Sequence, residues 1–309
     1  MEFDKYFKCP ICKGDFFRVN NSLKCEKGHS FDIASSGYIN LLKPGKMNNA
    51  KAGDSKEMIR ARSNFFECGA YLPIRDKICE IVSRLKNDLV VDAGCGEGYY
   101  TLGIANMLES SSVIGFDMSK FGCEHGAKTA RRVGKSNILY SVSSIYEMPL
   151  DDGCADIVVN MFAPVASEEF YRVLTTQGHL IVVSAGVEHL NGLKRILYDD
   201  VYDNEEKFLN YEGFELVGVE NLKYDADIHG CETIYNLFTM TPYFHRTSLN
   251  DKEKLKCIDK LETTIEVNFA IYKKIWYKKS YLIFSGRHFL CSFVYANKVK
   301  KTNFSSSYR

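Results

Sequence analysis

Four residues near the start of the chain have types and spacing that suit a metal ion. The pattern C-x2-C-x12-C-x3-H is made by Cys9, Cys12, Cys25 and His29. Two ligands two residues apart sit on a tight turn, and the second pair supplies the other corners of the tetrahedron that zinc adopts. Four protein ligands leave no open coordination position, so we expect a structural zinc ion and not a catalytic one. The competing interpretation is that these are ordinary core residues.

A glycine-rich segment provides the second set of residues that could do chemistry. It reads DAGCGEG from Asp92 to Gly98 and directly follows the apolar run LVV. Gly94, Gly96 and Gly98 let the backbone turn sharply and approach a ligand closely. A pyrophosphate-binding loop has the spacing G-x-G-x-x-G, and the carboxylates of Asp92 and Glu97 would repel a pyrophosphate. S-adenosylmethionine carries a sulfonium and an ammonium and no phosphate, so these acids favour that cofactor.

Residues after the next two apolar runs extend this site. Asp117 ends the run GFD about twenty residues after the glycines, where a carboxylate accepts hydrogen bonds from ribose hydroxyls. Ser143, Ser144 and Ile145 follow the third run, and we expect them to border the adenine, with Ser144 as a cofactor contact. The competing interpretation is an α/β domain with an incidental glycine loop.

The apolar runs themselves predict the elements that position these residues. Runs rich in Val and Ile occupy residues 88–94, 112–117, 137–142, 155–160 and 178–184, with helix-length segments or turns between them. The alternation predicts a mostly parallel sheet with helices on both faces, the Rossmann-like α/β fold of class I S-adenosylmethionine-dependent methyltransferases. Residues 214–222 and 264–272 are expected to be its closing strands.

Composition divides the chain into four parts. We predict a zinc-binding RNA-recognition module over residues 1–42, a linker and helix over 43–70, the methyltransferase domain over 71–274, and a basic, aromatic tail of unknown role over 275–309. The first part of the linker, 43–53, contains Pro and Gly and is typical of a mobile connection. Asp54 is expected to cap the following helix, with Glu57 three residues on.

Charge and cysteine usage bound the partners and the compartment. Lys and Arg number 40 against 39 Asp and Glu, yet residues 1–62 hold 12 against seven and residues 273–309 hold nine against none. Basic ends on an acidic body suit a polyanionic partner, although such charges also simply solvate a surface. Scattered single cysteines and the lack of a visible secretory signal or membrane-length apolar run predict a cytoplasmic protein with no membrane partner.

Several further segments have no generic physical explanation and together resemble one family. They are GHSFDIASSGYINLL (28–42), GDSKEMIRAR (53–62), YLPIRD (71–76), DAGCGEGYYT (92–101), GFDMSK (115–120), FAP (162–164), HL (189–190) and NLFTMTP (236–242). From about Cys9 to about Tyr272 the chain resembles the bacterial 23S rRNA (guanine-N1)-methyltransferases of the RlmA/RrmA type. The resemblance implies methyl transfer from S-adenosylmethionine to N1 of a guanine in a 23S rRNA hairpin. Relatives of this type either support ribosome function or contribute to macrolide resistance.

The resemblance also implies cofactor contacts. Carried over by position, Tyr71, Gly96, Glu97 and His189 contact the cofactor, beside Asp117. The alternatives are ordinary core packing for Tyr71 and a histidine satisfied by backbone at a helix start for His189.

The acceptor base is expected beyond the end of the fourth strand, where this fold class places its ligands. Asn160 would hydrogen-bond the guanine edge and Phe162 would stack on the base, with strand-end packing as the alternative for each. The N1 proton must leave before or during attack, and the sequence identifies no general base.

Two other functions stay open at this point. A zinc-containing methyltransferase acting on tRNA or a small molecule would use the same cofactor residues. A non-catalytic RNA-binding ribosome-assembly factor would keep the fold for binding only, but it has no need for the acids Asp92, Glu97 and Asp117. A homodimer is compatible with the sequence but not indicated by it.

Overall fold

The computed structural model describes residues 3–43, 53–200, 203–205, 208–255, 258–276, 280–285 and 288–293. Most of the linker predicted at residues 43–53 lies outside these ranges, as do residues 294–309 of the predicted tail.

A small antiparallel sheet carries the first part of the chain, which we call the N-terminal module (residues 3–38). A 3-10 helix, η1 (Asp4–Tyr6), precedes β1 (Phe16–Val19), β2 (Ser22–Cys25) and β3 (Ser30–Asp32), which pair in the order β1-β2-β3. The next strand, β4 (Ile39–Asn40), pairs in parallel with β7 (Ile138–Val142) of the main sheet. The chain therefore enters the large sheet directly from the module.

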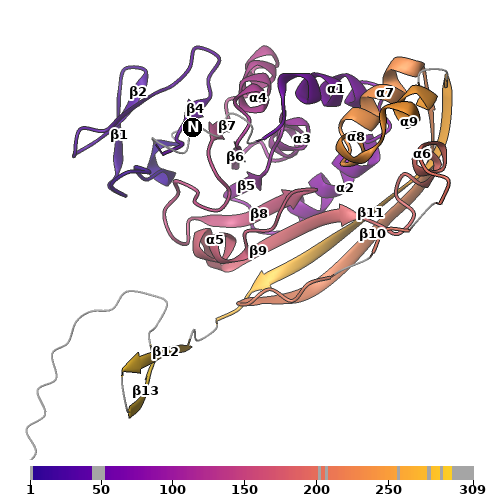
Figure 1. Cartoon of the computed structure of the whole chain (residues 1–309). Coiled ribbons are helices and arrows are strands. Elements are labelled where there is room, and N and C mark those ends of the chain that lie inside the picture. The colour runs from indigo at the N-terminus through magenta and orange to yellow at the C-terminus, as the bar shows by residue number, and fades with distance from the viewer. Residues whose placement is uncertain are drawn as a thin grey trace, which may run out of the picture.

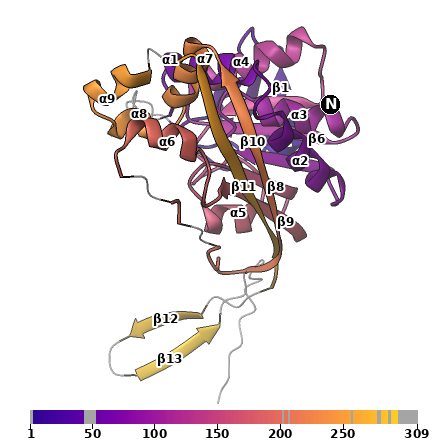
Figure 2. The same cartoon turned by 90° about the vertical axis from the view of Figure 1, so that its right-hand side faces the viewer.

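The main sheet has eight strands in the order β10-β11-β9-β8-β5-β6-β7-β4 (Figure 1). The neighbours from β9 to β4 run parallel; they include β5 (Leu89–Ala93), β6 (Ser112–Asp117), β8 (Ala155–Met161) and β9 (Leu174–Ala185). Two long antiparallel strands, β10 (Phe214–His229) and β11 (Lys260–Lys274), close one edge and lie side by side in Figure 2. The predicted mostly parallel α/β fold is confirmed.

One face of the sheet is covered by helices. Their bounds are α1 (Lys56–Phe66), α2 (Leu72–Ser83), α3 (Tyr99–Met107), α4 (Lys120–Arg132), α6 (Asn191–Leu197), α7 (Cys231–Thr239), α8 (Tyr243–Arg246) and α9 (Leu249–Lys254). Buried side chains of α1 to α4 and of α6 to α8 join strand residues such as Val90 and Tyr140 in one apolar cluster. Burial of this surface is the main stabilisation available to helices of such length.

The other face carries a short helix and, beside it, the N-terminal module, so helices lie on both faces as predicted. Its apolar cluster contains Phe170 and Val173 of the short helix α5 (Ser167–Val173), but also Phe3, Phe7 and Leu23 of the N-terminal module. The connection 143–154 between β7 and β8 forms no helix. It contains Pro and a Gly turn, which oppose a helix, and the module fills the space that a crossover helix would cover.

The start of α1 corrects one expectation, because Asp54 does not cap it. The N-cap is Ser55, whose side-chain oxygen accepts a hydrogen bond from the backbone N–H of Met58. Ser and Asp are about equally good caps, and the Asp54 carboxylate is instead paired with Arg62, at 2.5 Å from Nη1.

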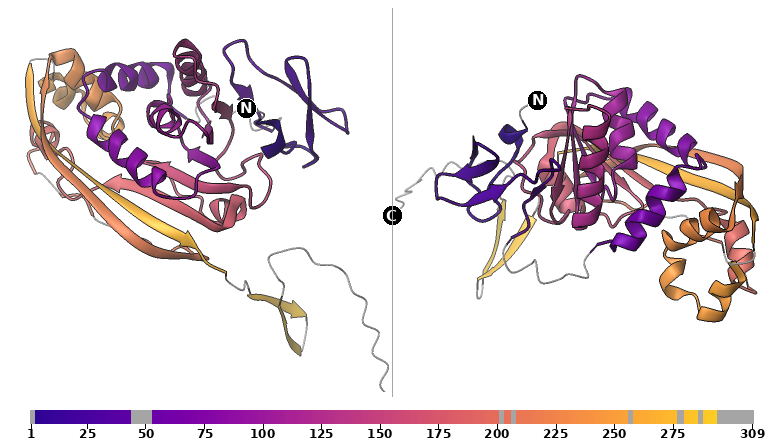
Figure 3. Two further views of the ribbon diagram at one scale, coloured as in Figure 1. Left: turned by 180° about the vertical axis from the view of Figure 1, so that it is seen from behind. Right: turned by 90° about the horizontal axis from the view of Figure 1, so that it is seen from above.

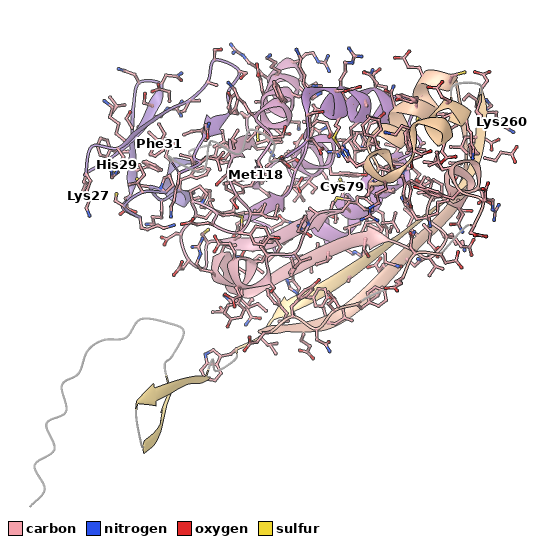
Figure 4. All side chains as sticks on the ribbon, viewed as in Figure 1. Lys27, His29, Phe31, Cys79, Met118 and Lys260 are labelled. Carbon is pink, nitrogen blue, oxygen red and sulfur yellow. The ribbon has the colours of Figure 1, made fainter. Side chains whose placement is uncertain are left out.

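The N-terminal module and the group α6 to α9 lie at opposite ends of the molecule (Figure 3). In Figure 4, Lys27, His29 and Phe31 mark the first end and Lys260 the second. Within the predicted tail, β12 (Ser280–Ser285) and β13 (His288–Phe293) pair antiparallel. Over the described ranges, no helix has the length and hydropathy of a membrane span.

Candidate active site and metal centre

The four predicted metal ligands come together in the N-terminal module. The ligand atoms of Cys9, Cys12, Cys25 and His29 all lie within 4.8 Å of one another. The sulfur of Cys12 is 3.5 Å from that of Cys25, and the sulfur of Cys25 is 3.3 Å from Nδ1 of His29. Ligands at about 2.3 Å from a tetrahedral zinc ion are roughly 3.8 Å apart, so this donor set fits zinc.

Two turns hold these ligands. After the first pair, Lys13 has a φ of 61° and donates its backbone N–H to the Cys9 carbonyl at 2.8 Å. Before His29, Gly28 has a φ of 81°, which glycine adopts without strain. Local turns thus bring together the two members of each ligand pair.

The module also docks against the loop between β7 and β8. Phe7 forms an antiparallel bridge with Leu150, and its ring packs edge-on against Phe116 of β6 at 6.2 Å between centroids. Lys8 forms an ion pair with Asp151 at 3.0 Å. These contacts immediately precede the first metal ligand, so the metal centre supports a loop of the main domain.

The glycine loop lies between β5 and α3, at the carboxyl end of the parallel strands. Gly94, Gly96 and Gly98 all have positive φ values, at 92°, 55° and 90°. A Cβ on Gly96 would lie 2.8 Å from Nη1 of Arg62, and one on Gly98 would lie 2.4 Å from the Tyr140 hydroxyl. The loop therefore needs glycine because its backbone adopts positive φ values and because a Cβ atom would clash with neighbouring side chains.

Two carboxylates in this loop have an oxygen without a hydrogen-bond partner among the described residues. Asp92 accepts a hydrogen bond from Thr101 at 2.6 Å through one oxygen, and its Oδ1 has none. Glu97 accepts from the backbone N–H of Tyr99 at 3.4 Å, and its Oε2 has none. Burial raises the pKa of each to about 7. Oε2 of Glu97 faces Nη1 of Arg62 at 3.6 Å, whereas Oδ1 of Asp92 has neither a hydrogen bond nor an ion pair among the described residues. Because buried polar atoms are normally paired, Oδ1 of Asp92 indicates that a ligand supplies the missing donor or positive charge, as S-adenosylmethionine would.

The Asp117 carboxylate, at the end of β6, hydrogen-bonds to the backbone of the glycine loop. One of its oxygens accepts the backbone N–H of Gly96 at 3.0 Å and the other that of Ser119 at 2.7 Å. The Asp117 carbonyl accepts the N–H of Ser143 at 3.0 Å, and the Ser144 hydroxyl accepts the N–H of Tyr146 at 3.3 Å. Asp117, Ser143 and Ser144 thus lie at one edge of the sheet, as the sequence predicts, and Ile145 beside them is buried.

Tyr71 and His189, far apart in sequence, lie in contact. Nε2 of His189 is 3.2 Å from the Tyr71 hydroxyl oxygen, and Nδ1 accepts the backbone N–H of Glu266 at 3.2 Å. Burial, together with the charge of Lys194, lowers the pKa of His189 to about 4. The ring is therefore neutral with its proton on Nε2, which donates to Tyr71. The Tyr71 hydroxyl proton stays available for a ligand.

The two residues predicted at the acceptor position differ in exposure. Asn160 is completely buried, and its amide nitrogen donates to the carbonyls of Ala93 at 2.9 Å and Pro164 at 3.2 Å. Phe162 is 46% exposed, has a φ of 52°, and lies nearly parallel to His189 with 6.1 Å between ring centroids. Phe162 thus presents an exposed ring, whereas the Asn160 nitrogen is used by the protein and the Asn160 Oδ1 has no hydrogen-bond partner among the described residues.

Sequence reasoning missed the segment Gly53 to Arg62, which forms a wall of the same site. A Cβ on Gly53 would lie 2.8 Å from the Ser119 backbone nitrogen, and the Ser119 hydroxyl donates to the Asp54 carbonyl at 2.8 Å. Nη1 of Arg62 lies 3.6 Å from Oε2 of Glu97. The motif GDSKEMIRAR carried this signal without a physical explanation, because its partners lie far along the chain.

Comparisons with known proteins cover both sites. Residues 7–49 match the family described as "RlmA, N-terminal", and residues 85–227 match the family described as "Methyltransferase domain". The chain is 32% identical to the 23S rRNA (guanine(748)-N(1))-methyltransferase of Streptomyces fradiae over 71% of this chain and 79% of the relative. It is 31% identical to the putative 23S rRNA (guanine-N(1)-)-methyltransferase YxjB of Bacillus subtilis (strain 168), over 63% and 69%. The putative 23S rRNA (guanine-N(1)-)-methyltransferase of Micromonospora griseorubida is 32% identical over 60% of this chain and 67% of the relative.

Proposed function

This chain belongs to the 23S rRNA (guanine-N1)-methyltransferases, and on that premise we propose that it methylates N1 of a guanine in a hairpin of 23S rRNA. Its cofactors are S-adenosylmethionine and a structural zinc ion. The observation that carries the proposal is the buried Asp92 carboxylate at the glycine turn, whose Oδ1 has no partner among the described residues, beside an exposed aromatic ring.

When bound, S-adenosylmethionine supplies an electrophilic methyl group on its sulfonium. We assign Asp117 to the ribose hydroxyls, because its carboxylate keeps lone pairs beyond the two backbone bonds. Oδ1 of Asp92, which has no partner among the described residues, and the Glu97 carboxylate suit the positively charged part of the cofactor. The Tyr71 hydroxyl oxygen accepts the proton of His189 Nε2, so we assign the hydroxyl proton of Tyr71 to a hydrogen bond with the cofactor.

Exposed aromatic side chains suit the acceptor base. Phe121, Tyr146 and Phe162 follow β6, β7 and β8 and are 47%, 61% and 46% exposed. A guanine leaves its stack to be reached by an enzyme, and stacking on an aromatic ring replaces the lost contacts. An unpaired base in a hairpin loop has the smallest unstacking cost, which favours a hairpin as substrate.

Positioning is the main catalytic contribution of this chain. The amide nitrogen of Asn160 ties the end of β5 to Pro164 and so positions the segment 162–164 beside the glycine loop. Oδ1 of Asn160 has no hydrogen-bond partner among the described residues and is the atom that we assign to the guanine edge. His189 does not take the N1 proton, because Nδ1 already accepts a backbone N–H and Nε2 carries its own proton.

A groove between the N-terminal module and α4 suits the RNA backbone. A cavity of about 450 Å³ is lined by Arg18 of β1 and by Arg131 and Lys135 at the end of α4. A shallower depression beside it adds Lys128 and Arg132. Phosphate contacts from Lys and Arg provide most sequence-independent affinity for nucleic acid. Such a substrate is made where ribosomes assemble, in the cytoplasm.

Methylation of protein-free transcripts tests the proposal. The purified, zinc-replete protein is incubated with S-adenosylmethionine and either 23S rRNA hairpin transcripts or tRNA, and the products are mapped by mass. We expect one N1-methylguanine in 23S rRNA and loss of product in Asp117→Asn. Methylation of tRNA alone would favour the broader methyltransferase reading. Cofactor binding without any product would favour an assembly factor.

A further inference from the structure

We propose that Arg62 binds the carboxylate at the methionine end of S-adenosylmethionine, with Asp54 holding the guanidinium in place. The inference rests on the cofactor named above and adds a residue that the glycine-loop motif does not contain.

The charge balance of the site requires such a residue. Asp92, Glu97 and Asp117 suit the cationic groups and the hydroxyls of the cofactor, but the methionine end also carries a carboxylate. Unscreened acids would repel it, since like charges in a buried site interact strongly. A cation must therefore lie among these acids, at the surface of the glycine loop.

Arg62 occupies that place. Its Nη1 lies 2.5 Å from Asp54 and 3.6 Å from Glu97, and it would be 2.8 Å from a Cβ on Gly96. Its side chain is 21% exposed, so the guanidinium lies within the site but is reachable by a ligand. Although burial opposes its charge, Glu97, Asp54 and Asp117 together raise the pKa of Arg62, so the guanidinium is always charged.

The guanidinium also has donors left. Both ion pairs of Arg62 involve Nη1, and among the described residues no side-chain hydrogen bond from Nε or Nη2 is found. A guanidinium offers five N–H donors in a fork that matches a carboxylate. A ligand carboxylate can thus be bound without breaking the pair with Asp54.

A rival cation on a neighbouring element, Arg75, is already occupied. The guanidinium of Arg75 on α2 lies 5.2 Å from the centre of the Tyr99 ring and 3.4 Å from Asp76. Its stem packs against Gly103 in the middle of α3, away from the glycine turn.

Calorimetric binding of S-adenosylmethionine and of its decarboxylated form tests the assignment in the full-length, zinc-replete protein. We expect Arg62→Met to weaken the affinity for S-adenosylmethionine by about 10- to 100-fold, because a charge-assisted hydrogen bond is lost. The decarboxylated form should bind no more weakly, because it lacks the group that Arg62 holds. Arg62→Lys should be intermediate, and Asp54→Asn should affect only the carboxylated ligand.

The matched control is Arg60→Met, since Arg60 is exposed on the same helix and should leave both affinities unchanged. If Arg62→Met and Arg62→Lys weakened the affinities for both ligands equally, Arg62 would only maintain the loop, and the assignment would be wrong. An unchanged affinity of Arg62→Met for S-adenosylmethionine would also overturn the assignment. If the unaltered protein bound neither ligand, the proposed function itself would fail, which is a distinguishable result.

Discussion

Phe162 combines an exposed ring with a backbone conformation that bulky residues rarely adopt. Its φ of 52° costs about 1–2 kcal/mol relative to glycine in the same conformation. Its N–H still donates to Val183 at 2.9 Å, so the β8–β9 pairing maintains the strain. Strain of this kind persists where the surroundings over-determine it, often at functional sites.

Phe162→Gly should therefore separate stability from activity. Relief of strain offsets the greater flexibility of glycine in the unfolded chain, so the free energy of unfolding should change by less than about 1 kcal/mol. Methylation of the hairpin should fall roughly 5- to 150-fold, because stacking on a base contributes about 1–3 kcal/mol. Thermal unfolding and initial rates measure the two effects. Phe162→Ala, which keeps the strain, should be equally slow but less stable; full activity in either variant would contradict the stacking role.

The buried acids predict a pH dependence of cofactor binding. Burial raises the pKa of Asp92 from 3.8 and that of Glu97 from 4.5, each to about 7. Raised carboxyl pKa values favour the folded, cofactor-free protein at low pH, and this stabilisation is lost as the pH rises through about 7. A cationic ligand needs the ionised forms, so affinity for S-adenosylmethionine should rise between about pH 6 and pH 8 with release of protons.

Calorimetry in buffers of different ionisation enthalpy measures that release directly. Glu97→Gln should bind more weakly and should lose part of the pH dependence, whereas Arg60→Met should keep all of it. An affinity that does not change over this pH range would mean that both carboxyls are already ionised in the cofactor-free protein.

Local spacing predicted the residues whose partners are near in sequence. The zinc ligands and the glycine loop follow from short motifs with a mechanical reason for each position. The sequence could not predict the contacts of Arg62 or the proton position on His189. Glu97, Tyr71 and Glu266 reach these side chains only through the pairing order of the strands and the packing of α1 and α2.

At the scale of elements, the N-terminal module replaces a helix. The connection from β7 to β8 carries Ser144 and Tyr146, and the module rather than a helix packs against it through Phe7 and Lys8. The strands were predictable from runs of Val and Ile, but this substitution was not, because η1 and β1 to β3 show no periodicity that points to a partner surface.

Phe7→Ala should uncouple the module from the sheet while leaving the metal centre intact. The ring is 1% exposed, and removing a buried phenylalanine costs about 3–5 kcal/mol. The zinc content should stay at one ion per chain, but the main thermal transition should fall and RNA methylation should weaken. Phe17→Ala is the matched control, since Phe17 is 48% exposed and such sites change stability by within about 0.5 kcal/mol. Loss of zinc from Phe7→Ala would instead show that docking and metal binding are one event.

At the scale of the whole molecule, the basic groove and the glycine loop lie near opposite ends of α4. Ser119, the N-cap of α4, donates its backbone N–H to the Asp117 carboxylate beside the glycine loop. Arg131 at the carboxyl end donates to the Ser35 carbonyl of the module at 2.7 Å. A single helix thus connects the surface assigned to phosphate binding with the cofactor site, so an extended RNA is needed to reach both.

Removing one cation from each wall of the groove tests this arrangement. Arg18 and Arg132 are exposed, and neither forms an ion pair within the described part of the chain. The double variant Arg18→Ala/Arg132→Ala should bind the hairpin more weakly, and the slope of log affinity against log salt should shrink by about one for each lost phosphate contact. Affinity for S-adenosylmethionine and the free energy of unfolding should not change, because neither side chain touches the cofactor site or the core.

Lys260→Ala is the control, since Lys260 lies at the other end of the molecule (Figure 4) and is 3.5 Å from Asp227. If this control and the double variant altered the salt slope equally, the RNA would be held by diffuse charge and not by the groove. If the double variant left the slope unchanged, the RNA would approach the exposed aromatics Phe121, Tyr146 and Phe162 without crossing α4.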